Sequence, residues 1–304
     1  MKNSLITVIG PTAIGKTALA ISLAKHFQTE VISSDSRQFY KEMTIGTAVP
    51  SREEQQEVPH HFIQHISIET AYSVGRFESD AMERLNSLFK KYNELILVGG
   101  SALYTRAVLQ GLDEFPEIKS GIREQLNRDF KKGGIPLLQD QLQALDPAYY
   151  KQVDLNNPHR LIRALEVCIS SGTPYSRFLN RPKRPRPFVS LLVGLKAERA
   201  VLYKHINKRV DLMMENGLLN EVKQLYPFKD HNALQTVGYQ ELFTYLEGRC
   251  SLDEAVAEIK KNTRRFAKRQ LTWYRKMENV LWFDHQTPHE EIALKVHSKI
   301  KISA

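Results

Sequence analysis

Cysteine is scarce in this sequence, with only Cys168 and Cys250 among 304 residues. The two lie far apart, and neither belongs to a paired-ligand motif. We therefore expect neither a disulfide framework nor a structural zinc site. So few cysteines suit a reducing compartment, and we expect a cytoplasmic location.

Long apolar runs are also lacking. No stretch approaches the roughly 20 apolar residues that span a bilayer, so no membrane segment is expected. The first apolar run, Leu5–Ile9, is not followed by a small-residue cleavage site, and we interpret it as a strand rather than a signal peptide. Hydrophobic residues at 42% and charged residues at 25% are typical of a globular protein with one large domain or two.

Acidic residues are in deficit, with 34 Asp and Glu against 43 Lys and Arg, which gives a net charge of +9. An excess of this size favours a polyanionic partner such as nucleic acid, although many basic proteins bind none. No internal repeat and no coiled-coil seam is evident, and we expect a monomer.

A glycine-rich turn follows the first apolar run. Its eight residues, Gly10, Pro11, Thr12, Ala13, Ile14, Gly15, Lys16 and Thr17, have the G-x-x-x-x-G-K-[ST] spacing of a P-loop. Such a turn points backbone N–H groups into one concavity at the start of a helix, where a diphosphate or triphosphate binds. Lys16 would reach the outer phosphate and the Thr17 hydroxyl would hold Mg²⁺.

The other apolar runs predict an α/β fold, a P-loop NTPase-like parallel sheet flanked by helices. The predicted strands are Leu5–Ile9, Val31–Ser33, Leu95–Val98, Ser190–Val193 and Val280–Phe283. Residues 112–187 predict a helical insertion with helices at 120–132, 136–144, 147–153 and 158–170, closed by a proline-rich basic connector at 181–187. The domains expected are thus 1–111 and 188–304 for the catalytic core and 112–187 for the insertion.

A long amphipathic helix is predicted near the end of the chain. Ser251 and Glu254 form a capping box that opens it, and it runs to about Met277. At about 100° per residue, its cations fall within an arc of roughly 140°. They are Lys261, Arg264, Arg265, Lys268, Arg269, Arg275 and Lys276, with Ile259, Phe266, Trp273, Tyr274 and Met277 on the other side. Either a solvated face or a phosphate-backbone contact explains this pattern.

The strand at Val31–Ser33 leads into Asp35, and the strand at Leu95–Val98 leads into Gly99-Gly100-Ser101. Because ligands collect at the carboxyl ends of parallel strands, we expect Asp35 and Ser101 near the P-loop. Asp35 suits a general base, but a turn-capping or metal-holding role is equally open. Three further histidines, His60, His61 and His65, lack zinc-type spacing, and polar packing is the better interpretation.

With these features, the chain resembles the bacterial tRNA dimethylallyltransferases, also called tRNA isopentenyltransferases. The matching segments occur in order from residue 5 to about 283. Besides the P-loop they are 32–48, with the pattern D-S-x-x-x-Y-x-x-M-x-I-G-T-A, then 58–62, 98–104, 157–167, 237–239 and 269–273.

The resemblance implies transfer of a dimethylallyl group from dimethylallyl diphosphate to the exocyclic N6 amine of the adenine just 3′ of a tRNA anticodon. It implies that the P-loop holds the donor's pyrophosphate, with Mg²⁺ at Thr17 and with Arg209 beside it. Asp35 then occupies the general-base position, and Ser101 lies beside the reacting amine. Lys16 completes the catalytic set.

The same resemblance implies a set of tRNA-binding residues. These are Asp35, Ser36, Arg37, Gln38, Ser101, Arg123, His159, Arg160, Leu161, Ile162 and Arg163. In one departure, Gln240 stands where relatives often carry a basic residue. With its two isolated cysteines, the chain is not expected to carry the zinc-finger extension of eukaryotic members.

Other functions remain open. One is prenyl transfer to a free adenine nucleotide, as by an adenylate isopentenyltransferase, although that reaction needs neither a helical insertion nor a basic helix. Another is a P-loop small-molecule kinase, with Asp35 activating a hydroxyl group. A non-catalytic NTPase switch is disfavoured, because glycines rather than an acid follow the strand at Leu95–Val98.

Overall fold

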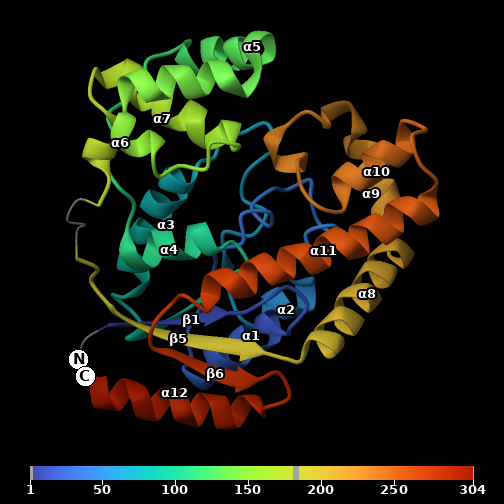
Figure 1. Ribbon diagram of the computed structural model, residues 1–304. Helices are drawn as coiled ribbons and strands as arrows, with labels where there is room; N and C mark the ends of the chain where they lie inside the picture. Colours follow the sequence, from blue (N-terminus) through green and yellow to red (C-terminus); the bar gives the residue numbers. More distant parts are fainter. Residues whose placement is uncertain (1–2, 181–184, 304) are drawn as a thin grey trace. The chain divides into compact units, whose positions relative to one another are not determined.

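A computed structural model describes residues 3–180 and 185–303 (Figure 1). The chain divides into two compact units. One, the core unit, comprises Met1–Gln110 and Arg186–Ala304, and the other, the helical unit, is Gly111–Pro185. The insertion expected from the sequence, 112–187, covers nearly the same residues.

The core unit is built on a six-stranded sheet with the order β3-β2-β4-β1-β5-β6, in which every neighbouring pair is parallel. The strands are β1 (Ser4–Ile9), β2 (Val31–Ser33), β3 (His60–His61), β4 (Glu94–Val98), β5 (Val189–Lys196) and β6 (Val280–Asp284). The five predicted strands and the α/β class are confirmed. β3 was not predicted, because two residues are too few to form a hydrophobic pattern.

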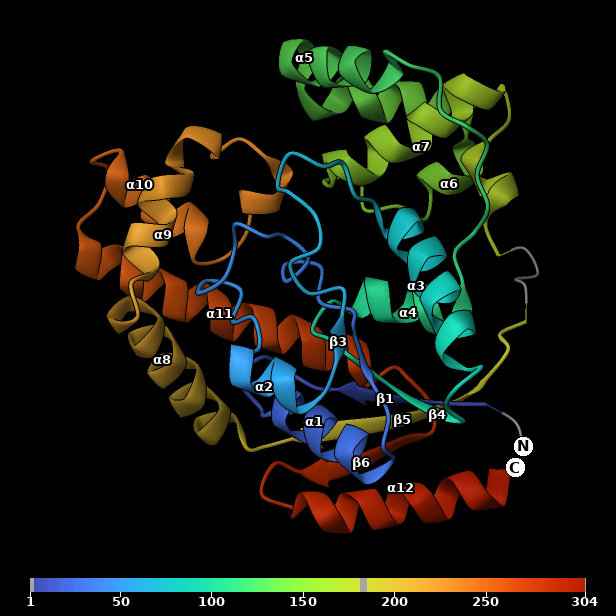
Figure 2. The same cartoon turned by 180° about the vertical axis from the view of Figure 1, so that it is seen from behind.

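Helices cover both faces of the sheet, as Figures 1 and 2 show. Side chains alternate between the faces along each strand. Leu5 and Leu97 join the apolar cluster that contains residues of α3 and α4, whereas Ile6 and Ile96 join the cluster that contains residues of α1 and α12. This two-sided burial explains why the strands appear in the sequence as continuous apolar runs.

The core-unit helices are α1 (Lys16–His26), α2 (Arg52–Glu57), α3 (Val74–Leu88), α4 (Ala102–Gln110), α8 (Arg199–Glu215), α9 (Leu218–Leu225), α10 (Tyr239–Leu246), α11 (Leu252–Tyr274) and α12 (His289–Ser303), with short 3₁₀ turns at Tyr226–Phe228 and Asn232–Leu234. α11 begins where predicted: the Ser251 side chain accepts a hydrogen bond from the Glu254 N–H, and the Glu254 carboxylate accepts one from the Ser251 N–H. No helix within residues 3–180 and 185–303 combines the length and apolar character that a membrane crossing requires.

The helical unit consists of α5 (Ile122–Leu145), α6 (Pro147–Tyr150), α7 (Pro158–Ser171) and a 3₁₀ turn at Tyr175–Phe178. Its core contains Leu126, Leu138, Leu161 and Leu165. α5 is kinked at Gly134, which has non-helical torsion angles, so the two helices predicted on either side of this point are confirmed. Residues 181–184 of the predicted connector lie outside the described residues.

Candidate active site

The P-loop joins β1 to α1 within the core unit. Gly10 and Gly15 have φ angles of 148° and 96°, in the range that side chains disfavour. A Cβ atom on Gly10 would lie 2.9 Å from the Leu195 carbonyl oxygen. Position 10 therefore requires glycine both because its φ angle is positive and because there is no room for a side chain.

Lys16 is the first residue of α1. Its Nζ donates a 2.8 Å hydrogen bond to the Pro11 carbonyl oxygen. Burial lowers the pKa of Lys16 to about 8; the nearby Arg209 also lowers it, while the Asp35 carboxylate opposes the shift. A phosphate group bound beside this amine would therefore strongly stabilise its protonated form.

A cavity of about 840 Å³ opens at the carboxyl edge of the sheet, where β1, β2 and β4 end. All its lining residues belong to the core unit. It brings together the side chains predicted from distant parts of the sequence: Lys16, Thr17, Asp35, Ser101 and Arg209. Burial lowers the pKa of Arg209, and the Asp35 carboxylate opposes that shift.

Asp35 is held by the turn after β2 and by the end of β4. Its Oδ1 accepts a 3.1 Å hydrogen bond from the Arg37 N–H. A Cβ atom on Gly100 would lie 3.1 Å from Asp35 Oδ2, and one on Gly99 would lie 2.3 Å from Ser34 Oγ. Gly99 therefore lets the end of β4 approach Ser34 and the Asp35 backbone closely, and Gly100 lets it approach the carboxylate.

Ser101 lies beside this turn. Its Oγ accepts a 3.0 Å hydrogen bond from the Ser36 N–H and lies 2.9 Å from Ser36 Oγ. Ser101 thereby fixes the backbone immediately after Asp35 while lining the cavity.

Arg37 and Gln38 also line the cavity, but most of their side-chain hydrogen-bond donors bond to other residues of the core unit. Arg37 Nη1 donates to the carbonyl oxygens of Asn232 and Ala233, both at 2.9 Å. Gln38 Nε2 donates to the Ala48 carbonyl at 2.9 Å. These two side chains hold together three segments that line the cavity wall.

The cavity face of α11 differs from a simple apolar face. Phe266 and Trp273 are 37% and 36% exposed and line the cavity, whereas the polar Gln270 between them is buried. The seven cations are not equivalent either. Arg264 bonds to Asn207 of α8 at 2.8 Å, and the Arg269 guanidinium lies over the Phe266 ring.

Gln270 was not singled out by the sequence analysis. Its Oε1 accepts a 2.8 Å hydrogen bond from the Thr12 N–H, and its Nε2 donates one of 2.8 Å to the Gly100 carbonyl. The Thr12 N–H is therefore already bonded within the protein, and Pro11 has no N–H, so any contact of these two residues with a diphosphate would use other atoms than a free backbone amide. The sequence did offer one signal for Gln270, which is a polar residue on the apolar side of the predicted helix.

Glu221 of α9 was also missed. Its carboxylate accepts hydrogen bonds from the N–H groups of Thr44, Ile45 and Gly46 at 3.0, 2.8 and 3.0 Å, and from the Tyr239 hydroxyl at 2.6 Å. A Cβ on Gly46 would lie 2.6 Å from the Tyr239 ring. Two of the sequence blocks behind the family resemblance, around Gly46 and around Tyr239, thus pack on each other.

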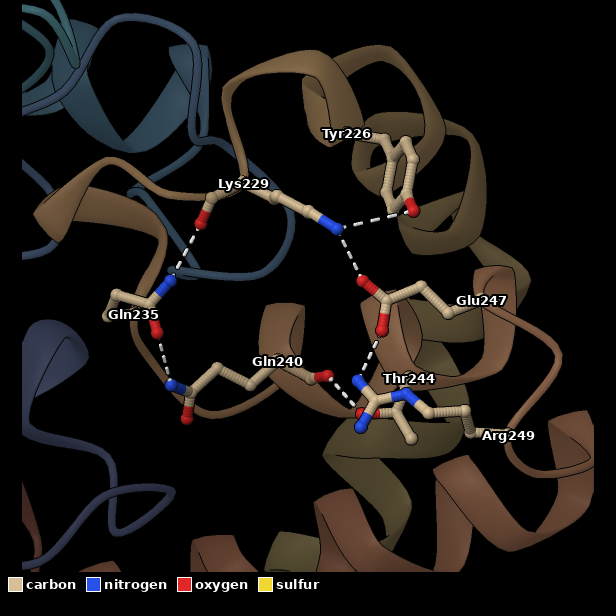
Figure 3. A network of polar contacts seen from close by, with 7 residues as sticks. All are labelled: Tyr226, Lys229, Gln235, Gln240, Thr244, Glu247 and Arg249. Atoms are coloured by element: carbon tan, nitrogen blue, oxygen red, sulfur yellow. Dashed lines mark hydrogen bonds and ion pairs between the residues drawn. The ribbon is translucent and has the colours of Figure 1, made fainter.

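A chain of polar contacts braces the segment between α9 and α11 (Figure 3). Gln240 Nε2 donates to Gln235 Oε1 at 2.6 Å, and Gln235 Nε2 donates to the Lys229 carbonyl at 2.7 Å. The Lys229 amine in turn contacts Glu247, which also binds Arg249. Gln235 and Gln240 line the cavity, so this network holds one part of its wall.

The tRNA-binding residues predicted in the helical unit divide into two groups. Arg123 and Arg163 both contact Glu166, whose side chain is 2% exposed, and Leu161 and Ile162 are buried in the unit's core. Packing covers the Leu161 and Ile162 side chains, so the predicted tRNA contact at these two positions would have to be made by the backbone. His159 and Arg160 are exposed at the start of α7.

The three histidines have local partners. His61 Nε2 lies 2.6 Å from Glu30 Oε2, and His60 Nδ1 lies 2.7 Å from the Val58 carbonyl oxygen. His65 packs edge-on against Phe39. In the part of the chain that the structure describes, no three His, Cys, Asp or Glu side chains cluster as a metal site.

A P-loop and a carboxylate that follows the second strand line one cavity, an arrangement that suits a group-transfer enzyme with a phosphorylated donor. The model of the IPP transferase family matches residues 38–277. The chain belongs to that family, and it is a prenyltransferase. It is 55% identical over 300 residues to the tRNA dimethylallyltransferase of Christiangramia forsetii, an alignment that covers 99% of both chains.

Two solved structures are similar. The tRNA isopentenylpyrophosphate transferase of Bacillus halodurans gives a TM-score of 0.73 at 37% identity, covering 99% of this chain and 96% of that one. A eukaryotic dimethylallyltransferase acting on tRNA gives 0.79 at 27% identity, covering 94% of this chain and 74% of that one. The fold predicted from the sequence is thus confirmed.

Proposed function

We propose that this enzyme transfers a dimethylallyl group from dimethylallyl diphosphate to the N6 amine of the adenine just 3′ of a tRNA anticodon, and releases pyrophosphate. The names of its relatives support a tRNA acceptor. The observation that carries the proposal is the meeting of the P-loop and Asp35 in one cavity.

The P-loop side of the cavity suits the leaving group. Negative charge grows on pyrophosphate as the allylic C–O bond breaks, and the electron pair of that bond leaves with it. Lys16 and Arg209 supply positive charge where it is needed, in a buried site in which electrostatic stabilisation is strong. The amides that follow Thr12 at the start of α1 add the positive end of a helix dipole.

Mg²⁺ fits this side of the cavity. The Thr17 hydroxyl lines it, and a hard oxygen donor of this kind, completed by substrate phosphates, is what Mg²⁺ prefers. When bound, Mg²⁺ would neutralise part of the pyrophosphate charge. Thr17 is the residue we expect to hold it.

The opposite side suits the acceptor. The lone pair of an adenine amine is delocalised into the ring, so the amine is a weak nucleophile. As its nitrogen bonds to the allylic carbon it loses a proton, and the Asp35 carboxylate is the base that takes this proton. Ser101 keeps the Asp35 turn in place through Ser36.

The adenine must leave its stack to enter the cavity, which costs a few kcal/mol and least in a single-stranded loop. An anticodon loop meets this requirement better than a duplex does. The exposed cations of α11, and His159 with Arg160 of α7, are the groups we expect to contact the RNA backbone.

Two arms of one assay separate this function from the kinase alternative. The enzyme is incubated with unmodified tRNA and labelled dimethylallyl diphosphate, and separately with tRNA and γ-labelled ATP. Label that moves from the prenyl donor to tRNA supports the proposal, and label that moves only from ATP refutes it. AMP in place of tRNA tests the free-nucleotide alternative, for which we expect much slower transfer.

A further inference from the structure

Gln270 connects three parts of the active site. It lies on α11, it is only 4% exposed, and its amide bonds the P-loop through Thr12 and the end of β4 through Gly100, each at 2.8 Å. Thr12 is 258 positions away in the sequence. A single side chain therefore ties the loop that receives the diphosphate to the loop that precedes Ser101.

The amide group is required on both sides of this bridge. The Thr12 N–H needs an acceptor and the Gly100 carbonyl needs a donor, and a glutamine amide supplies one of each. The bond to the Gly100 carbonyl is buried, so leaving that oxygen without a donor is costly. One turn further along α11, the buried Tyr274 hydroxyl donates to the Gly99 carbonyl at 3.3 Å, so α11 holds two successive carbonyls.

The bridge also lies close to the base. A Cβ atom placed on Gly100 would be 2.8 Å from Gln270 Nε2 and 3.1 Å from Asp35 Oδ2. A shift of Gly100 relative to the P-loop therefore changes the separation of Asp35 from the diphosphate site. Transfer between two bound groups depends steeply on that separation, and a displacement of about 1 Å costs on the order of 100-fold in rate.

We propose that Gln270 is a positioning residue that sets the distance between the P-loop and the Asp35 side of the cavity. This inference rests on the proposed function for its substrates. Both ends of the Gln270 amide are bonded within the protein, and its effect on the reaction is exerted through Thr12 and Gly100.

The test uses the full chain with Gln270→Met, which preserves length and shape but loses both hydrogen bonds. Binding of inorganic pyrophosphate is measured by calorimetry, and single-turnover transfer to tRNA is measured at saturating donor, well below the unfolding midpoint. We expect weaker pyrophosphate binding and a turnover lowered on the order of 10- to 100-fold. Gln224→Met, an exposed glutamine of α9, is the matched control and should change neither.

A purely structural role gives a different result. In that case Gln270→Met lowers the unfolding midpoint, while pyrophosphate affinity and turnover of the folded protein stay at the wild-type level; this outcome overturns the proposal. Should Gln270→Met not fold, Gln270→Asn, which keeps an amide one methylene short, is judged by the same two measurements. If the wild-type enzyme transfers nothing to tRNA while Gln270→Met still weakens pyrophosphate binding, the proposed function is refuted. The positioning of the P-loop by Gln270 is then still supported.

Discussion

Asp35 is the carboxylate that we place against the attacking amine, so Asp35→Asn removes the base while keeping the shape of the side chain. We expect turnover to fall by about 10²- to 10⁴-fold, which is the usual contribution of a general base. Affinity for tRNA should not weaken, because no phosphate contact is lost. Single-turnover transfer and filter binding measure the two quantities.

Asp230→Asn provides the control, because Asp230 is exposed and does not line the cavity. Near-normal turnover in Asp35→Asn would show that the carboxylate only caps its turn through the Arg37 N–H.

The lowered pKa of Lys16 predicts that the enzyme uses the prenyl donor less efficiently at alkaline pH. Its pKa is lowered to about 8, chiefly by burial, with Arg209 adding to the shift and Asp35 opposing it. Only the protonated amine attracts pyrophosphate, so kcat/KM for the donor should fall as pH rises through about 8. Lys16→Arg keeps its charge over that range. For Lys16→Arg, kcat/KM for the donor should therefore not fall as pH rises through about 8, even if the rate is lower overall. If kcat/KM of the variant falls over the same pH range as that of the wild type, a group other than Lys16 is responsible.

Arg123 illustrates how a residue predicted to bind RNA also has a structural task. Its guanidinium pairs with Glu166, which is 2% exposed. Among the residues that the structure describes, Arg123→Ala leaves that carboxylate with the 3.5 Å contact to Arg163 as its one remaining ion pair. We expect the free energy of unfolding to drop by about 1–3 kcal/mol, the cost of an undersatisfied buried charge. Urea denaturation of Arg123→Ala and of the exposed control Arg128→Ala checks this, and equal midpoints would contradict it.

α11 is the element in which the sequence pattern and the structure diverge most. The pattern predicts its span and its basic face correctly. It does not reveal that Arg264 bonds α8, or that Gln270 is buried between two exposed aromatic residues. Helical periodicity assigns residues to faces, but whether a face meets solvent, another helix or a cavity depends on contacts between distant segments.

The basic face of α11 should therefore be tested with its exposed cations. Lys268→Glu with Arg275→Glu reverses two charges that are open to solvent. If both contact tRNA phosphates, affinity should fall and the slope of log K against log salt should decrease by roughly one to two. Binding measured over a range of salt concentrations gives that slope.

The matched control is Lys295→Glu with Lys301→Glu on α12, which changes the net charge equally. Should both pairs reduce affinity by the same amount, the overall charge of +9 rather than the face of α11 governs binding.

The sheet was predictable because parallel strands that are buried on both faces consist of continuous runs of apolar residues, as in Leu95–Val98. The helical unit was predictable because its prolines and caps, such as Asn157 before Pro158, mark helix starts. Gln270 and Glu221 were not predictable in the same way. Their partners are fixed by tertiary packing over separations of 258 and about 176 positions, which no local pattern encodes.

The two compact units predict a division of labour within the chain. Every residue that lines the described cavity comes from the core unit. Substitutions at exposed positions of the helical unit should therefore affect recognition of tRNA and not of the donor. His159 and Arg160 are the exposed members of the predicted set on α7, and their replacement leaves the unit's apolar core intact.

We expect His159→Ala with Arg160→Ala to raise the KM for tRNA several-fold through the loss of phosphate contacts. Pyrophosphate affinity and the unfolding midpoint should stay unchanged. Lys131→Ala with Lys132→Ala, two exposed cations of α5, tests whether the position or merely the charge matters. If KM for tRNA does not respond to the α7 pair, the helical unit does not recognise the acceptor through these residues. If pyrophosphate affinity falls instead, the units are coupled and the division of labour is refuted.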